Sequence, residues 1–188
     1  MKVIIICSVL LFLMTIFATQ TGSATPKQTK SKFNDLIYTY TIFSERSEKT
    51  KQINCLAKNI YFEARNEPFA GQLAVAMVTL NRVHDDKFPN SLCKVVYEGR
   101  HWPSGHPKRD QCQFSWYCDG KLDDILNERA FEQSQNIAGL AWESYLDIKE
   151  QGLDITEGAR YYHTYEVSPR WSKVYPVVGR IGDHIFYR

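Results

Sequence analysis

The chain has 188 residues, of which 44% are hydrophobic, and its 23 basic and 21 acidic side chains give a formal net charge of +2. This near balance of charge lacks the basic excess typical of proteins that bind nucleic acid. A chain of this length has room for one domain with a substantial core, and we find no internal repeat or separate binding module. Any substrate must therefore be bound by the one domain.

Residues 1–24 are predicted to form a secretory signal peptide. Lys2 precedes an apolar run over residues 3–17, and Gly22 and Ala24 fit the small-x-small cleavage pattern. The run is short for a membrane span, although an uncleaved anchor is the alternative. We expect an exported protein, periplasmic or secreted, without membrane contact after cleavage, and the loss of Lys2 lowers its formal net charge to +1.

Residues 25–51 are predicted to be a linker and N-terminal extension, and residues 52–188 the catalytic domain. The stretch 25–31 is polar and contains lysines, and the stretch 33–43 is apolar and aromatic without a clear period. A charged run then leads into the domain.

The stretch 59–67, NIYFEARNE, is predicted to be a helix with one carboxylate at the border of its apolar face. That carboxylate is Glu63, and the apolar stripe beside it comprises Ile53, Leu56, Ala57, Ile60 and Ala64. Apolar neighbours disfavour the charged form of a carboxyl group, so its pKa rises and it can donate a proton. Asn59 and Asn66 lie on the same strip and are expected to bind sugar groups. The alternative is that these are ordinary surface charges of an amphipathic helix.

Four cysteines remain after removal of the signal peptide. In an oxidising compartment this even number favours two disulfides among three possible pairings. We favour Cys55–Cys93, which ties the Glu63 helix to the segment after the next helix, and Cys112–Cys118, which closes a small loop. A zinc site of Cys93, Cys112, Cys118 and either His101 or His106 is the alternative, with poor spacing. We expect neither a metal nor an organic cofactor.

A second helix is predicted to begin at Pro68 and to continue over residues 70–83, with Leu73, Ala76, Met77 and Leu80 on a core face. Residues 85–90 break it, and residues 91–98 are ambiguous. The stretch 99–110 is rich in Gly, Pro and basic residues and is predicted to be a loop, in which Trp102 either stacks on a sugar ring or packs under the loop.

The next stretch, 111–120, is predicted to be a compact aromatic ridge inside the small disulfide loop. Its candidate polysaccharide-binding residues are Gln113, Phe114, Ser115 and Trp116. Residues 128–149 form the longest helical pattern, which Gly152 is suited to end. Residues 159–164 and 180–187 are predicted strands around a turn at 168–171, and Tyr162 is a further candidate binding residue. His163 and His184 could serve a site, but a structural role is the preferred interpretation.

Several stretches together resemble the cell wall hydrolase family typified by spore cortex-lytic enzymes of the SleB and CwlJ kind. They are NIYFEARNEP (59–68), GQLAVA (71–76), LNRV (80–83), CQFSW (112–116) and IGDHIFY (181–187). In having these four cysteines, the chain is similar to the members of this family found in Gram-negative bacteria and their phages. The resemblance implies a lysozyme-like, mainly helical α+β fold with a small C-terminal β element, activity on peptidoglycan, and Glu63 as the catalytic acid.

Cleavage of a β-1,4 glycosidic bond needs a proton for the leaving oxygen and stabilisation of an oxocarbenium-like centre. Glu63 can supply the proton, and Glu67 and Asp119 are the candidates for a second carboxylate. If neither faces the cleft, the muramoyl C6 hydroxyl attacks the anomeric carbon and Glu63 returns as base. We expect this lytic transglycosylase route, with a 1,6-anhydro product, at the MurNAc-GlcNAc bond of peptidoglycan glycan strands.

Two other readings of the chain stay open at this point. The first is lysozyme-type hydrolysis of the same bond with water. The second is a protein without catalysis, which either binds peptidoglycan or is a structural secreted disulfide protein. The sequence leaves the oligomeric state undetermined.

Overall fold

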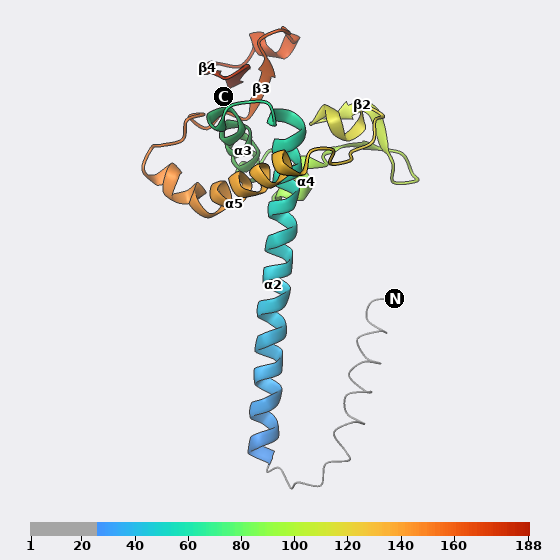
Figure 1. Cartoon of the computed structure of the whole chain (residues 1–188), viewed down its shortest axis with the longest axis vertical. Helices are drawn as coiled ribbons and strands as arrows, with labels where there is room; N and C mark the ends of the chain where they lie inside the picture. The colour runs from blue at the N-terminus through green and yellow to red at the C-terminus, as the bar shows by residue number, and fades with distance from the viewer. Residues whose placement is uncertain (1–25) are drawn as a thin grey trace. The chain divides into compact units, whose positions relative to one another are not determined.

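The computed structural model describes residues 26–188 (Figure 1), and side chains from residue 31 onward. The predicted signal peptide lies outside the described residues. The chain divides into two compact units, of which the second, Arg46–Arg188, contains every feature discussed below except the start of the first helix.

The first described helix is α2 (Pro26–Ala64), which continues across the boundary between the two units. The predicted linker and N-terminal extension, residues 25–51, is helical from Pro26 onward. Within the first unit this helix exposes the large apolar side chains Phe33, Leu36, Ile37, Tyr38, Tyr40, Ile42 and Phe43. Among residues 26–188, no helix combines the length and the apolar character needed to cross a membrane.

Three further helices build the core of the second unit: α3 (Phe69–Val83), α4 (Leu92–Val96) and α5 (Glu128–Glu150). The two long ones confirm the helices predicted over residues 70–83 and 128–149. Helix α5 begins where the Asn127 side chain accepts a hydrogen bond from the Ala130 N–H, at 3.0 Å. It ends before Gly152, whose φ of +67° favours glycine.

Helix α3 is buried on two faces, so it is the element around which the rest packs. One face contacts α2, α4 and α5 in a cluster of buried residues that comprises Leu56, Ala57, Ile60, Ala76, Met77, Leu80, Leu92, Ile137, Ala138, Ala141 and Tyr145. Figure 1 shows α3 and α5 close together, in agreement with this packing. Ala74 and Val78 on the other face pack against Ala159 and Phe186 of the C-terminal region.

The C-terminal region is an antiparallel sheet in the order β3-β5-β4, formed by β3 (Tyr161–Thr164), β4 (Val177–Ile181) and β5 (His184–Tyr187). A short 3-10 helix, η2 (Arg170–Lys173), lies between β3 and β4. The prediction of one strand over residues 180–187 was wrong, because the chain reverses at Gly182, which has a φ of +60°. A residue with positive φ ends a strand and allows the tight turn between β4 and β5.

The predicted loop at 99–110 was also wrong in part. Two short antiparallel strands, β1 (Gly99–His101) and β2 (Pro107–Cys112), form a hairpin there, and a 3-10 helix, η1 (Ser115–Cys118), follows it. Phe114 and Trp116 pack with Val95 and Val96 of α4 in a third cluster of buried residues. The aromatic ridge is therefore largely an internal wall of the domain.

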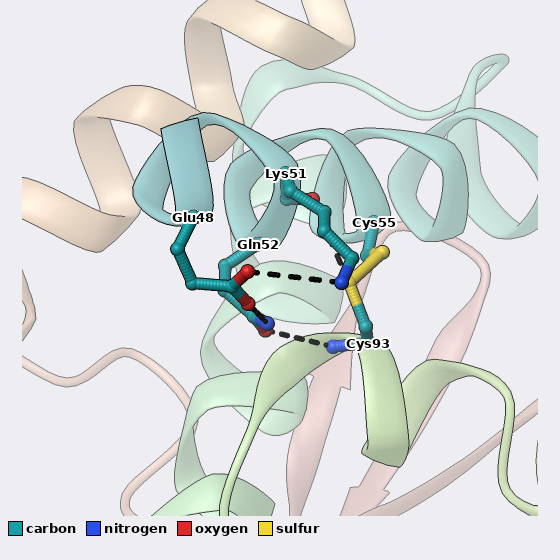
Figure 2. The surroundings of a disulfide bond; sticks show 5 residues. All are labelled: Glu48, Lys51, Gln52, Cys55 and Cys93. Atoms are coloured by element: carbon teal, nitrogen blue, oxygen red, sulfur yellow. Dashed lines mark hydrogen bonds and ion pairs between the residues drawn. A yellow bond between two sulfur atoms is a disulfide. The ribbon is translucent and has the colours of Figure 1, made fainter. Parts of the chain in front are cut away.

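Two disulfides are formed, Cys55–Cys93 and Cys112–Cys118, the pairings favoured from the sequence. The first joins α2 to α4 (Figure 2), and the Gln52 side chain beside it accepts a hydrogen bond from the Cys93 N–H at 3.0 Å. Glu48 in turn accepts a hydrogen bond from Gln52 at 2.7 Å. Because all four sulfur atoms are paired, the zinc site considered from the sequence is not formed by these cysteines.

A buried polar network fixes the connection between α5 and the sheet. Asp154 accepts hydrogen bonds from Thr156 and Gly158 and forms an ion pair with Lys149 at 3.0 Å. Asn81 of α3 donates to the Ala159 carbonyl at 3.0 Å and accepts a hydrogen bond from Tyr145. Burial alone would raise the pKa of Asp154, but the hydrogen bonds from Thr156 and Lys149 outweigh it and lower that pKa.

We expect the substitution Asp154→Asn to lower the free energy of unfolding by about 2 kcal/mol at pH 7, because a charged acceptor is lost. A group with a lowered folded-state pKa stabilises above its unfolded pKa, and that contribution disappears as pH falls through the folded value. Urea denaturation at pH 7 and below pH 4 checks this: the gap between wild type and variant should narrow in acid. An equal gap at both pH values would contradict it, and Asp147→Asn on the exposed side of α5 is the control.

Candidate active site

Glu63 lies in the last turn of α2 and faces the sheet. Its Oε2 atom accepts a hydrogen bond from the Tyr162 hydroxyl at 3.0 Å. The register of β3 and β5 pairs Tyr162 with Phe186 and Thr164 with His184. Because side chains alternate along a strand, these four residues share one face of the sheet. The sheet face that packs Phe186 against α3 thus also presents Tyr162 and Thr164 of β3 and His184 of β5 on the Glu63 side.

The environment of Glu63 favours its protonated form. Burial raises the pKa of the Glu63 carboxyl group, although the hydrogen bond from Tyr162 and the positive charge of Arg82 act in the opposite direction. Burial, together with the nearby Glu63 charge, also holds the pKa of the Tyr162 hydroxyl well above its ordinary value. Tyr162 therefore stays a hydrogen-bond donor, and Glu63 is a carboxyl group suited to deliver a proton.

The positive charge of Arg82 acts on Glu63 and lowers the pKa of its carboxyl group. Its side chain is buried, donates from Nε to the Arg160 carbonyl at 2.7 Å, and lies over the rings of Phe88, Phe114 and Tyr161 at 5.0 to 5.8 Å. A guanidinium group among aromatic faces keeps its charge in a partly desolvated site. Arg82 thus stabilises the Glu63 carboxylate once the proton has left, without occupying the cavity.

Glu63 borders a cavity of about 250 Å³ between the end of α2 and the sheet. Its lining comes from three segments of the chain: the end of α2 with the turn after it, the end of β3 with the two residues that follow, and the turn and strand start between β4 and β5. The lining residues are Phe62, Glu63, Ala64, Arg65, Asn66, Glu67, Thr164, Tyr165, Glu166, Asp183 and His184. The cavity therefore presents the Glu63 carboxyl group, whose pKa is raised, among other acidic and polar side chains that can hydrogen-bond a sugar.

The structure places the predicted site residues in different surroundings. Asn66 and Glu67 line the cavity with Glu63, and Tyr162 contacts Glu63 directly. Asn59 does not line it: the residue is 0% exposed, donates to Thr79 at 3.1 Å, and accepts a hydrogen bond from the Trp116 indole at 3.0 Å. Asn59 therefore holds Trp116 in place.

Trp116 and Asp119 border a second cavity of about 390 Å³, which shares Phe62 and Arg65 with the first. The Trp116 ring stacks on Phe62, with centroids 4.6 Å apart. Asp119 forms an ion pair with Lys121 at 3.3 Å and does not line the Glu63 cavity. Phe62 thus contacts the aromatic ridge and also lines the Glu63 cavity.

The other predicted binding residues lie away from both cavities. Phe114 is buried beside α4, Ser115 begins η1, and Gln113 borders a separate hollow with Glu98 and Arg100. Trp102 lies in the hairpin of β1 and β2, where it is 56% exposed and Lys108 lies over its ring at 4.5 Å.

The sequence analysis missed the cavity residues contributed by the sheet. Thr164, Tyr165, Glu166 and Asp183 were not singled out, and His184 was assigned a structural role. His184 is 3% exposed, and its Nδ1 atom has no hydrogen-bond partner among the described residues. Burial lowers the pKa of its imidazole ring, so the ring is neutral at neutral pH. The motif at 181–187 was the signal that pointed to this segment.

Residues 66–187 match the family described as Cell Wall Hydrolase. The chain is 34% identical over 135 residues to the spore cortex-lytic enzyme of Bacillus subtilis (strain 168), which covers 71% of this chain and 36% of that protein. It is 33% identical over 135 residues to the spore cortex-lytic enzyme of Bacillus cereus, covering 71% of this chain and 43% of that protein. The chain thus spans less than half the length of these curated relatives.

A solved structure with the same fold is the catalytic domain of the germination-specific lytic transglycosylase SleB from Bacillus anthracis. It is 30% identical, has a TM-score of 0.51, and covers 73% of this chain and 93% of that chain. The match confirms the mainly helical α+β, lysozyme-like fold expected from the sequence. With the family match over residues 66–187, it shows that this chain belongs to the cell wall hydrolase family.

Proposed function

We propose that the protein is an exported peptidoglycan glycosidase in which Glu63 is the general acid and base. The observation that carries the proposal is the pairing of a carboxyl group of raised pKa with a neutral hydrogen-bond donor, Tyr162, at the edge of a polar cavity. The names of the relatives support the substrate class, since they are cortex-lytic enzymes and a lytic transglycosylase. The predicted signal peptide agrees with a substrate outside the cytoplasm.

The proposed reaction cleaves the β-1,4 bond between MurNAc and GlcNAc. The Glu63 proton passes to the leaving oxygen as the glycosidic bond breaks, and the Glu63 carboxylate then takes the proton of the MurNAc C6 hydroxyl as that oxygen bonds to the anomeric carbon. Proton and electron pairs balance without water, and the product is a 1,6-anhydro end. Asp119 lies in the neighbouring cavity, and the carboxylate of Glu67 is held by the protein, so neither of the two candidates from the sequence supports a two-carboxylate mechanism. Glu166 and Asp183 also line the Glu63 cavity, and the chemistry of the product separates a mechanism that uses one of them from the single-acid route.

Digestion of purified peptidoglycan tests the proposal. We expect mass spectrometry to find cleaved glycan strands whose MurNAc ends are 1,6-anhydro and do not gain hydrogen on borohydride treatment. Reducing ends that gain two hydrogens would instead show hydrolysis with water. Cleavage of peptide bonds alone, or binding without cleavage, would overturn the glycosidase assignment.

The substitution Tyr162→Phe provides a test of the acid assignment through the pH profile. It removes the hydrogen bond that stabilises the Glu63 carboxylate, so the Glu63 pKa rises further. An acid must be protonated to act, so activity falls as pH rises through its pKa. We expect this upper limb of the pH–activity profile, the fall in activity at high pH, to move to higher pH in Tyr162→Phe. The rate at the optimum should fall about tenfold. An upper limb that stays in place, measured by release of labelled glycan, would contradict the pairing.

A further inference from the structure

Glu67 lies in the cavity lining, but its carboxylate already contacts other residues of the protein. The side chain is 10% exposed, and its Oε2 atom accepts a hydrogen bond from the Asp183 N–H at 3.1 Å. Its Oε1 atom lies 3.9 Å from Nδ1 of His184, the buried ring nitrogen that has no hydrogen-bond partner. Both contacts are to the turn and strand start between β4 and β5, 116 residues further along the chain.

Two glycines make the space that this carboxylate fills. A Cβ atom at Gly182 would lie 1.8 Å from Glu67 Oε2, and one at Gly71 would lie 2.8 Å from the same atom. Real Cβ atoms do not approach so closely, so any side chain at Gly182 must displace the carboxylate. The slot for Glu67 therefore depends on the absence of side chains at these two positions, one on α3 and one between β4 and β5.

The backbone of Glu67 is fixed as well. Its N–H donates to the Ala64 carbonyl at 2.9 Å, and its carbonyl accepts a hydrogen bond from the buried Gln72 side chain at 2.9 Å. The position of the side chain is thus set by α2 and α3 rather than by the turn it contacts. Glu67 transmits the position of these helices to the opposite wall of the cavity.

We propose that Glu67 is a positioning residue, whose carboxylate between Gly71 and Gly182 holds the β4–β5 turn so that Asp183 and His184 form the cavity wall next to Glu63. The effect on rate rests on the proposed function, whereas the effect on the turn does not. A second catalytic carboxylate would have to interact with the substrate through its negative charge. A positioning group needs only to accept the Asp183 hydrogen bond and fill the slot.

Three substitutions separate these roles. Glu67→Gln keeps the shape and an oxygen acceptor, so we expect the Asp183 N–H to stay protected from hydrogen exchange and the rate of glycan release to remain within about threefold of wild type. Glu67→Ala removes both, so exchange at Asp183 should accelerate about tenfold or more, and the rate should fall about 100-fold. Gly182→Ala should reproduce the Glu67→Ala loss while Glu67 is still present, because the methyl group displaces the carboxylate and a side chain also strains the turn at a φ of +60°.

The double variant Glu67→Ala/Gly182→Ala completes the cycle. Because the slot is empty once Glu67 is removed, the added methyl group should reduce the rate much less than it does in the wild-type background. Glu132→Ala, on the exposed side of α5, is the control for loss of an acidic side chain, and melting temperatures identify any variant that fails to fold.

Hydrogen exchange needs no substrate, so it decides the positioning role even if the chain proves inactive on peptidoglycan. The proposal is overturned if Glu67→Ala leaves exchange at Asp183 unchanged. It is also overturned if Glu67→Gln loses as much activity as Glu67→Ala while Asp183 stays protected, because the charge itself would then be required.

Discussion

The variant Glu63→Gln is expected to release glycan from purified peptidoglycan about 1,000-fold more slowly than the wild-type protein. The Gln amide has nearly the shape of the carboxyl group, and its oxygen can still accept the hydrogen bond from Tyr162. It cannot deliver a proton to the leaving oxygen, so the chemical step loses its acid while the cavity keeps its form. The measurement is the initial rate of release of soluble labelled fragments.

Two comparisons make this loss interpretable. The melting temperature of Glu63→Gln should equal or exceed that of the wild type, because a partly buried carboxyl group at an active site costs stability. Binding to sacculi should persist, and Glu132→Gln on α5 should retain full activity. Wild-type rates from Glu63→Gln would contradict the assignment of Glu63 as the catalytic acid.

Loss of the Cys55–Cys93 disulfide is expected to have the largest effect on stability. This bond closes a loop with a sequence separation of 38 residues and joins α2, which carries Glu63, to α4 (Figure 2). A cross-link lowers the chain entropy of the unfolded state, which raises the free energy of unfolding by about 4 kcal/mol for a loop of this length. The double substitution Cys55→Ser/Cys93→Ser should therefore lower the melting temperature by about 10–15 °C.

The second disulfide is the matched control for that prediction. Cys112–Cys118 has a sequence separation of only 6, so Cys112→Ser/Cys118→Ser should lower the free energy of unfolding by only about 2 kcal/mol. The order of the two effects is the test, read by thermal unfolding under non-reducing conditions. If the short-loop variant melts lower than the long-loop variant, loop entropy does not dominate at these bonds.

The helices were predictable because their signals are local. The apolar positions of α3 and α5 repeat with the helical period, Pro68 precedes the first, and Gly152 follows the second. The border position of Glu63 on α2 was visible in the same way. The two cysteine pairings were favoured because the first ties the predicted Glu63 helix to the segment after the next helix and the second closes a small loop.

The strands and the other half of the site were harder to predict because they depend on contacts between distant residues. Strand β1 has three residues, and its pairing with β2 is irregular, so the hairpin lacks the alternation that marks a strand. The hydrogen bond between Glu63 and Tyr162 joins residues 99 positions apart, and the register of β3 and β5 decides which side chains face it. No local pattern carries that register.

Asn59 illustrates the same limit within a single helix. Its position beside Glu63 on the helical wheel suggested a binding role, yet it is buried between Thr79 and the Trp116 indole. Neighbouring positions on one strip of a helix can face the cavity or the core, depending on what packs against each. The packing of η1 against α2 decided the outcome here.

The surroundings of Glu63 raise the pKa of its carboxyl group, and a direct titration of that group tests the role of Glu63 as the acid. Carbon-13 NMR of the substrate-free protein can follow the Glu63 carboxyl signal, assigned by its absence from Glu63→Gln. We expect a titration midpoint above the ordinary value of 4.5, because burial outweighs the hydrogen bond from Tyr162 and the charge of Arg82. A midpoint at or below 4.5 would contradict it.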